Sequence, residues 1–120
     1  MKLSLIIATY NQQDSLAKVF QGLSRQTKLP DEILIADDGS TDQTRELIER
    51  WRSQISISVH HLWHPDNGFL KTTILNRAVA QAVGDYLVFT DGDCVPHPRF
   101  IADHRKLAER GFWVQGRRCF

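Results

Sequence analysis

The chain has 120 residues, of which 42% are apolar and 24% charged, the composition of a globular protein with one hydrophobic core. Its 15 Lys and Arg residues nearly balance 14 Asp and Glu residues, for a formal net charge of +1. This balance argues against nucleic acid or an anionic membrane as the main partner, since both select clustered positive charge.

Cysteine content and the N-terminal sequence bear on location. Cys94 and Cys119 are too few for a disulfide framework or a structural zinc site, which favours a reducing compartment. The opening residues, MKLSLIIATY, hold an apolar run too short for a signal peptide or a membrane span. We therefore expect a cytoplasmic protein, free or peripheral at the inner membrane.

The first predicted strand covers residues 3–8, which are apolar apart from Ser4 and therefore suit a buried parallel strand. A helix is predicted next, because apolar residues recur at the spacing i, i+3, i+4, i+7. Asp14 or Ser15 is placed to cap its start, and Pro30 closes the connection. The apolar positions of this helix are Leu16, Val19, Phe20 and Leu23.

The second predicted strand is EILIAD at residues 32–37. A second helix follows, for which Ser40 and Gln43 have the spacing of a capping box. Residues 55–63, ISISVHHLW, alternate apolar and polar side chains and predict a strand near the sheet edge, followed by the turn HPDNG. The short apolar side of the second helix is Leu47, Ile48 and Trp51.

A third helix is predicted from Leu70, with Gly84 at its C-terminal stop, and residues 86–90 form the next strand. A fourth helix is predicted over residues 98–110, with Pro98 in its first turn and Gly111 ending it. The closing segment, FWVQGRRCF, starts as a fifth strand. The apolar positions of the third helix are Leu70, Ile74, Leu75, Ala78, Val79 and Ala82.

This order, βαβαβαβαβ, predicts one α/β domain over residues 1–120, a Rossmann-like three-layer α/β/α sandwich with a mostly parallel sheet. Ligands of such sheets bind outside the carboxyl ends of the strands. Three predicted strands end there in polar clusters, so we expect these clusters on one rim. They are Thr9-Tyr10-Asn11, Asp37-Asp38-Gly39-Ser40 and Thr90-Asp91-Gly92-Asp93.

The last of these clusters places two carboxylates, Asp91 and Asp93, on either side of Gly92. Carboxylates this close repel each other unless a cation joins them, and Mg²⁺ or Mn²⁺ prefers such oxygen ligands. Gly92 allows a tight turn beside the ligand. The alternative is an ordinary solvated turn, since Asp and Gly favour turns.

Three stretches together resemble the nucleotide-binding half of family 2 inverting glycosyltransferases, which have the GT-A fold. They are SLIIATYNQ, ILIADDGSTDQT and NRAVAQAVGDYLVFTDGDCVPHP, in the family's order and spacing over nearly the whole chain. The motif GDYLVFTDGDC-x-P is most similar to the branch of chondroitin-type polymerases and galactosyltransferases.

The resemblance implies a uridine site. Thr9 and Tyr10 match residues that line the uracil pocket, with Asn11 beside them, and Asp38 matches the carboxylate that accepts from the uracil ring N–H. From the residues alone, Tyr10 can instead cap the sheet, and Asp37 or Asp38 can cap the helix that follows.

The resemblance also implies a metal site. Asp91 matches the first acid of the D-x-D motif, near the ribose and donor sugar, and Asp93 matches the second, which binds Mn²⁺ or Mg²⁺. Lys71 lies where many members carry a basic residue facing the nucleotide, although a solvated helix lysine is the alternative. Members often carry Arg-Asn late in this helix, where this chain has Asn76-Arg77.

The implied reaction is a single displacement in which the metal neutralises the leaving diphosphate of a UDP-sugar. The acceptor would be a glycan or lipid-linked hydroxyl in polysaccharide biosynthesis. The resemblance places the catalytic base on an acidic motif after the D-x-D strand, so we expect it beyond Phe120. Asp103 and His104 lie on a helix that we expect to face away from the site. The resemblance thus implies a donor-binding half, truncated at the C-terminus, that binds uridine nucleotides weakly and transfers no sugar alone.

Truncation would leave the last strand without a neighbour, with Trp113 and Phe120 exposed, so we expect self-association through that edge. The rival function is a non-catalytic receiver-like signalling or nucleotide-binding module, with the Asp37-Asp38 pair as its acidic pocket. His60, His61 and His64 suggest a zinc site, which is disfavoured because the adjacent strand residues His60 and His61 point to opposite faces and no cysteine lies near them in sequence.

Overall fold

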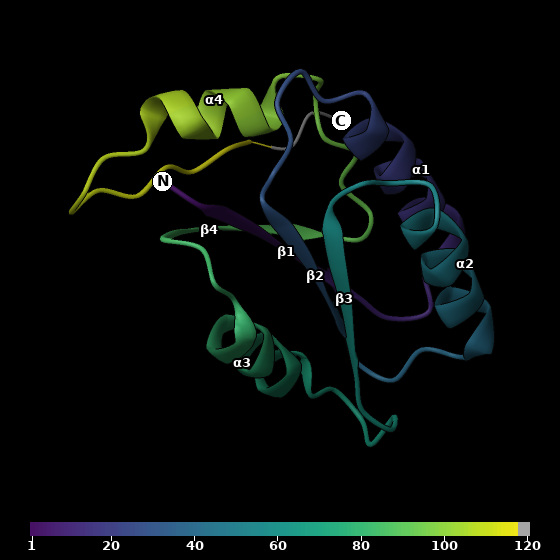
Figure 1. The fold of residues 1–120 in the computed structure, drawn as a ribbon. Coiled ribbons are helices and arrows are strands. Elements are labelled where there is room, and N and C mark those ends of the chain that lie inside the picture. The colour runs from purple at the N-terminus through teal and green to yellow at the C-terminus, as the bar shows by residue number, and fades with distance from the viewer. Residues whose placement is uncertain (118–120) are drawn as a thin grey trace.

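The computed structural model describes residues 1–117, which fold into eight elements in strict βα alternation (Figure 1). Cys119 and Phe120 lie outside the described residues. The predicted order is confirmed through the fourth helix. The elements are β1 Leu3–Thr9, α1 Gln13–Ser24, β2 Glu32–Asp37, α2 Asp42–Arg52, β3 Ser58–Trp63, α3 Lys71–Gln81, β4 Tyr86–Asp91 and α4 Phe100–Leu107.

The four strands form one parallel sheet in the order β3-β2-β1-β4. The predicted parallel sheet and the edge position of β3 are therefore confirmed. Along the sheet, Thr9 pairs with Asp37 and Ala8 pairs with Asp91. This register brings the polar ends of β1, β2 and β4 to one rim.

Helices cover both faces of the sheet, with α1 and α2 on one side and α3 on the other (Figure 1). The two central strands are mostly apolar because both of their faces are covered, and every residue of β1 and β2 is buried, including Glu32 and Asp37. The smaller core, under α3, consists of Ile6, Leu34, Ala36, Leu62, Ile74 and Ala78. The larger core, under α1 and α2, includes the stacked rings of Phe20 and Trp51.

The predicted helix caps are wrong in detail. Helix α1 starts at Gln13, so Asp14 lies inside its first turn. The N-cap of α2 is Thr41, because the Ser40 hydroxyl accepts instead from the Asn11 backbone N–H at 2.8 Å. The predicted capping box does not form, because Ser40 makes a hydrogen bond to the loop after β1 instead of capping α2.

Gly84 has a different role from the predicted helix stop. Helix α3 ends at Gln81, and a Cβ atom at Gly84 would overlap the Ser4 hydroxyl. The Gly84 backbone N–H donates to that hydroxyl at 2.8 Å. The glycine therefore allows the chain entering β4 to approach β1 closely.

The C-terminal part differs most from the prediction. Helix α4 spans eight residues and begins after Pro98, and residues 112–117 form no strand. A strand needs a neighbour for its backbone hydrogen bonds, and within residues 1–117 no segment pairs with 112–117. Trp113 is 92% exposed, while Phe120 lies outside the described residues, and self-association stays a prediction. None of the described helices has the length and apolarity needed to cross a membrane.

Candidate nucleotide and metal site

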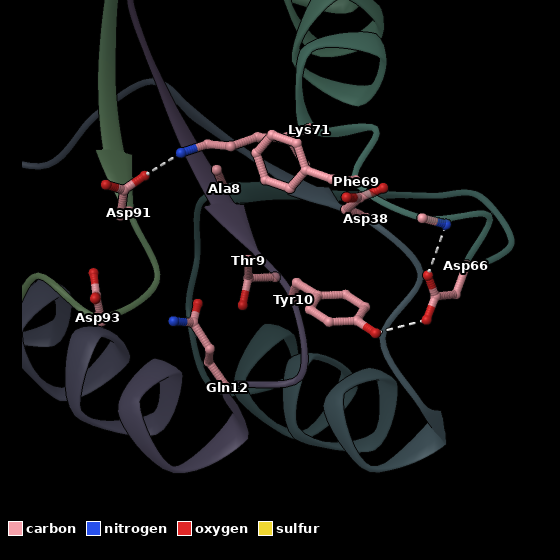
Figure 2. A pocket seen from close by; sticks show the side chains of 12 residues that line it. Ala8, Thr9, Tyr10, Gln12, Asp38, Asp66, Phe69, Lys71, Asp91 and Asp93 are labelled. Carbon is pink, nitrogen blue, oxygen red and sulfur yellow. Dashed lines mark hydrogen bonds and ion pairs between the residues drawn. The ribbon is translucent and has the colours of Figure 1, made fainter.

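A cavity of about 470 Å³ lies at the carboxyl rim of the sheet (Figure 2). Its walls come from the ends of β1, β2 and β4 and from the loop between β3 and α3, which are distant in sequence. A cavity of this size falls in the range of small-molecule sites. The lining residues are Ala8, Thr9, Tyr10, Gln12, Ala36, Asp38, Asp66, Gly68, Phe69, Lys71, Asp91 and Asp93.

The Asp37-Asp38 pair divides into a structural and a cavity residue, because successive strand residues point to opposite faces. Asp37 is fully buried, accepts from the Ser40 backbone N–H at 2.9 Å and contacts His61 at 2.8 Å. Asp38 points to the α3 side and lines the cavity. Asp37 thus holds the turn into α2, whereas Asp38 presents its carboxylate to the cavity.

Asp38 is held from the loop that follows β3. Its Oδ1 lies 2.6 Å from His64 Nε2, and its Oδ2 accepts from the Leu70 backbone N–H at 3.0 Å. The carboxylate is nearly buried, with 7% of its side chain exposed. Each oxygen keeps lone-pair capacity for a further donor, so Asp38 can accept a hydrogen bond from a ligand N–H.

Tyr10 closes the cavity on the side of Asp66. The Tyr10 hydroxyl donates to Asp66 Oδ2 at 2.6 Å (Figure 2). This hydrogen bond and the Asp66 charge both raise the pKa of the Tyr10 phenol above its ordinary value. Gly39, at φ +92°, permits the contact, since a Cβ there would lie 2.6 Å from the Asp66 backbone.

The opposite end of the cavity carries paired charges. Lys71, the first residue of α3, places Nζ 3.1 Å from Asp91 Oδ1 (Figure 2). Asp91, Asp93 and Cys94 each offer a ligand atom, and these atoms lie within 4.8 Å of one another. Two carboxylates in such a group suit a hard divalent cation.

Gly92 packs this charged turn against β1. Its backbone N–H donates to the Ala8 carbonyl at 2.7 Å, and a Cβ at Gly92 would lie 2.9 Å from Thr9 Oγ1. The Thr9 hydroxyl itself is buried, and no group among residues 1–117 forms a hydrogen bond with it. Thr9 therefore offers an unused polar group on the cavity wall.

Six of the seven residues proposed from the sequence line this one cavity: Thr9, Tyr10, Asp38, Lys71, Asp91 and Asp93. Asn11 does not line it. Its side-chain oxygen accepts from the Thr41 backbone N–H at 2.9 Å, and its φ of +46° turns the chain away from β1. Asn11 therefore joins the turns that follow β1 and β2, and the roles of all seven in binding stay predictions.

The cavity is also lined by Gln12, Asp66 and Phe69, which no sequence motif indicated. Around Asp66 the sequence predicts only a turn. Its place after the carboxyl end of a parallel strand was an available signal, since all such ends meet at one rim.

The histidines make separate contacts. His60 lies 3.6 Å from Glu32, whereas His61 and His64 contact Asp37 and Asp38. Within residues 1–117 none of them belongs to a group that could hold a metal ion.

The model of the family described as glycosyl transferase family 2 matches residues 4–118. The chain is 34% identical over 95 residues to the poly(ribitol-phosphate) beta-N-acetylglucosaminyltransferase TarS of Staphylococcus aureus, covering 78% of this chain and 16% of TarS. It is 28% identical over 106 residues to chondroitin synthase of Escherichia coli, covering 88% of this chain and 15% of that enzyme. The chain therefore spans less than a fifth of the length of either relative.

Solved structures of glycosyltransferases are similar to this chain as well. TarS residues 1–349 in complex with UDP-GlcNAc superpose with a TM-score of 0.72 at 30% identity, covering 88% of this chain and 30% of that one. The mannosyltransferase PcManGT of Pyrobaculum calidifontis, in complex with GDP-Man and Mn²⁺, superposes with a TM-score of 0.78 at 25% identity. That match covers 91% of this chain and 33% of the other.

Proposed function

The chain belongs to glycosyl transferase family 2, and we propose that its cavity binds a UDP-sugar together with a divalent cation. The bound donor would be the substrate of an inverting sugar transfer to a glycan or lipid-linked hydroxyl in polysaccharide biosynthesis. TarS and chondroitin synthase, whose names both refer to polymers, support this acceptor class. A cytoplasmic location, free or peripheral at the inner membrane, is part of the proposal.

One observation carries the proposal: a base-binding end and a cation-binding end share one cavity. Asp38 and Tyr10 form the first end, and Asp91 and Asp93 form the second (Figure 2). A nucleoside diphosphate has the same order of groups, with a base at one end and a pyrophosphate at the other. Asp38 suits the ring N–H of uracil, because an ionised carboxylate only accepts hydrogen bonds.

The residues present fit a divalent cation. Asp93 and Asp91 would hold it, as two oxygen donors with Cys94 beside them. The position of the Lys71 ammonium, 3.1 Å from Asp91, is consistent with a place that attracts positive charge. When bound, the cation would supply neutralisation of the charge that develops on the leaving diphosphate.

The chain's own residues would bind and orient the donor. Lys71 can turn from Asp91 towards a phosphate oxygen, since its side chain is 40% exposed and flexible. We propose that proton removal from the acceptor belongs to a carboxylate beyond Phe120. Asp103 is exposed on α4, where Arg99 lies 3.7 Å away. Helix α4 lies by the amino ends of the strands, since Arg105 contacts Asp31 just before β2.

Thermal unfolding of the 120-residue chain tests the proposal. A ligand that binds only the folded state raises the midpoint by mass action. We expect UDP with Mn²⁺ to raise it more than UDP with a chelator, and ADP with Mn²⁺ to raise it less. Stabilisation by a phosphoryl donor and Mg²⁺, without a response to UDP, would instead support a receiver-like module. The separate surroundings of Asp37 and Asp38 argue against that module's shared acidic pocket.

A further inference from the structure

Phe69 is a large apolar side chain left 85% exposed at the cavity. We infer that Phe69 and Tyr10 form two aromatic walls of a slot that takes the nucleobase, with Asp38 at its polar edge. The inference rests on the proposed function and adds a residue that determines how the base is held. Aromatic rings commonly bind bases by stacking on the face of the ring.

The backbone that carries Phe69 is held against Asp38. The N–H of the peptide joining Phe69 to Leu70 donates to Asp38 Oδ2 at 3.0 Å. On its other side, Gly68 adopts φ +88°, a conformation that reverses the chain at little cost only for glycine. Phe69 is therefore held close to the carboxylate that would accept from the base.

Asp66 contacts both the Tyr10 side chain and the turn that precedes Phe69. Its Oδ2 accepts from the Tyr10 hydroxyl at 2.6 Å, and its Oδ1 accepts from the Gly68 backbone N–H at 3.3 Å. One carboxylate thus orients the Tyr10 ring and the turn that leads into Phe69. Figure 2 shows the Tyr10 and Phe69 rings, together with Asp38, among the side chains that line the cavity.

The chemistry of the two cavity ends selects the base over the phosphates as the partner of Phe69. Phosphates need positive charge, and Lys71 with the Asp91 and Asp93 cation site supplies it at the other end. The Phe69 ring has no charge and no hydrogen-bond donor for a phosphate, whereas a planar base placed between two rings makes contact on both of its faces. An 85% exposed Phe69 also contributes little to the core, so its packing gives no reason for its position.

The test compares Phe69→Ala with Phe112→Ala, which removes a similarly exposed ring (70%) outside the cavity. Affinities of the 120-residue chain for uridine, UMP and UDP are measured by calorimetry and NMR titration with Mg²⁺, which is diamagnetic and leaves the NMR signals sharp. Phe69→Ala should weaken all three by the same factor, about ten-fold, because each carries the same base. Phe112→Ala should bind as the wild type, and Phe69→Tyr should restore affinity. Urea unfolding of each variant establishes that it folds.

NMR provides a second readout that a merely structural role would not alter. Stacking shifts the uracil ring protons upfield through the ring current of Phe69, and the shift should shrink in Phe69→Ala and in Phe69→Leu. Wild-type affinity and shifts in Phe69→Ala would overturn the slot, as would a loss confined to UDP. A wild-type chain that does not bind UDP at all would overturn the proposed function and the slot with it.

Discussion

Replacing Gly39 by alanine should weaken both the fold and the nucleotide site. Gly39 sits at φ +92° in the turn after β2, and an added Cβ would lie 2.6 Å from both the N and Cα atoms of Asp66. Real Cβ atoms essentially never approach backbone so closely, so the loop carrying Asp66 must move. That movement would stretch or break the Tyr10–Asp66 hydrogen bond at 2.6 Å.

Two effects should lower the free energy of unfolding of Gly39→Ala. The left-handed backbone costs about 1–2 kcal/mol for a residue with a Cβ. Overpacking against a backbone that must shift adds about 1–3 kcal/mol. The free energy of unfolding should therefore fall by about 2–5 kcal/mol in Gly39→Ala, which is a large part of the roughly 5–15 kcal/mol by which a typical domain is stable.

Gly111→Ala is the matched control. Gly111 has a similar φ of +83°, but a Cβ there meets nothing within 4 Å, so only the backbone part of about 1–2 kcal/mol applies. Urea unfolding measures the free energies, and UDP titration with Mn²⁺ measures the site. Gly39→Ala should lose stability and affinity, whereas Gly111→Ala should keep its affinity. Equal losses of stability in the two variants, or unchanged UDP binding by Gly39→Ala, would refute the close approach of Asp66.

Three further predictions concern single side chains. Asp93→Asn should abolish the part of UDP stabilisation that depends on Mn²⁺, whereas Asp103→Asn, which changes an exposed carboxylate on α4, should leave it intact in the same thermal assay. Lys71→Met should weaken UDP binding about ten-fold but leave uridine binding unchanged by calorimetry, because the ammonium recognises phosphate; an equal loss for uridine would contradict this role. Asp66→Asn should lower the pKa of Tyr10 towards its ordinary value in a near-ultraviolet absorbance titration, and an unchanged pKa would count against the hydrogen bond. Since the pKa is raised in the folded protein, the linked stability is present below pH 10 and is lost as the pH rises through the raised value.

The sequence by itself determined the order of the elements and the rim on which the site lies. The apolar run at residues 3–8 predicts a fully buried strand, and EILIAD at residues 32–37 predicts a second strand, because each pattern depends on which faces a segment must bury. Parallel strands bring their carboxyl ends to the same edge. The polar residues after β1, β2 and β4 therefore had to meet, whatever the details of packing.

Only the tertiary structure decided which polar groups face the cavity and which support it. Residue type alone does not distinguish Asp37 from Asp38, although the family resemblance pointed to Asp38. Their different surroundings follow from which face of the sheet α3 covers. Likewise, the Tyr10–Asp66 bond joins residues 56 positions apart, and the Asn11–Ser40 bond joins residues 29 apart. Such contacts depend on how loops from different strands pack together, and a local pattern of residue types carries no information about that packing.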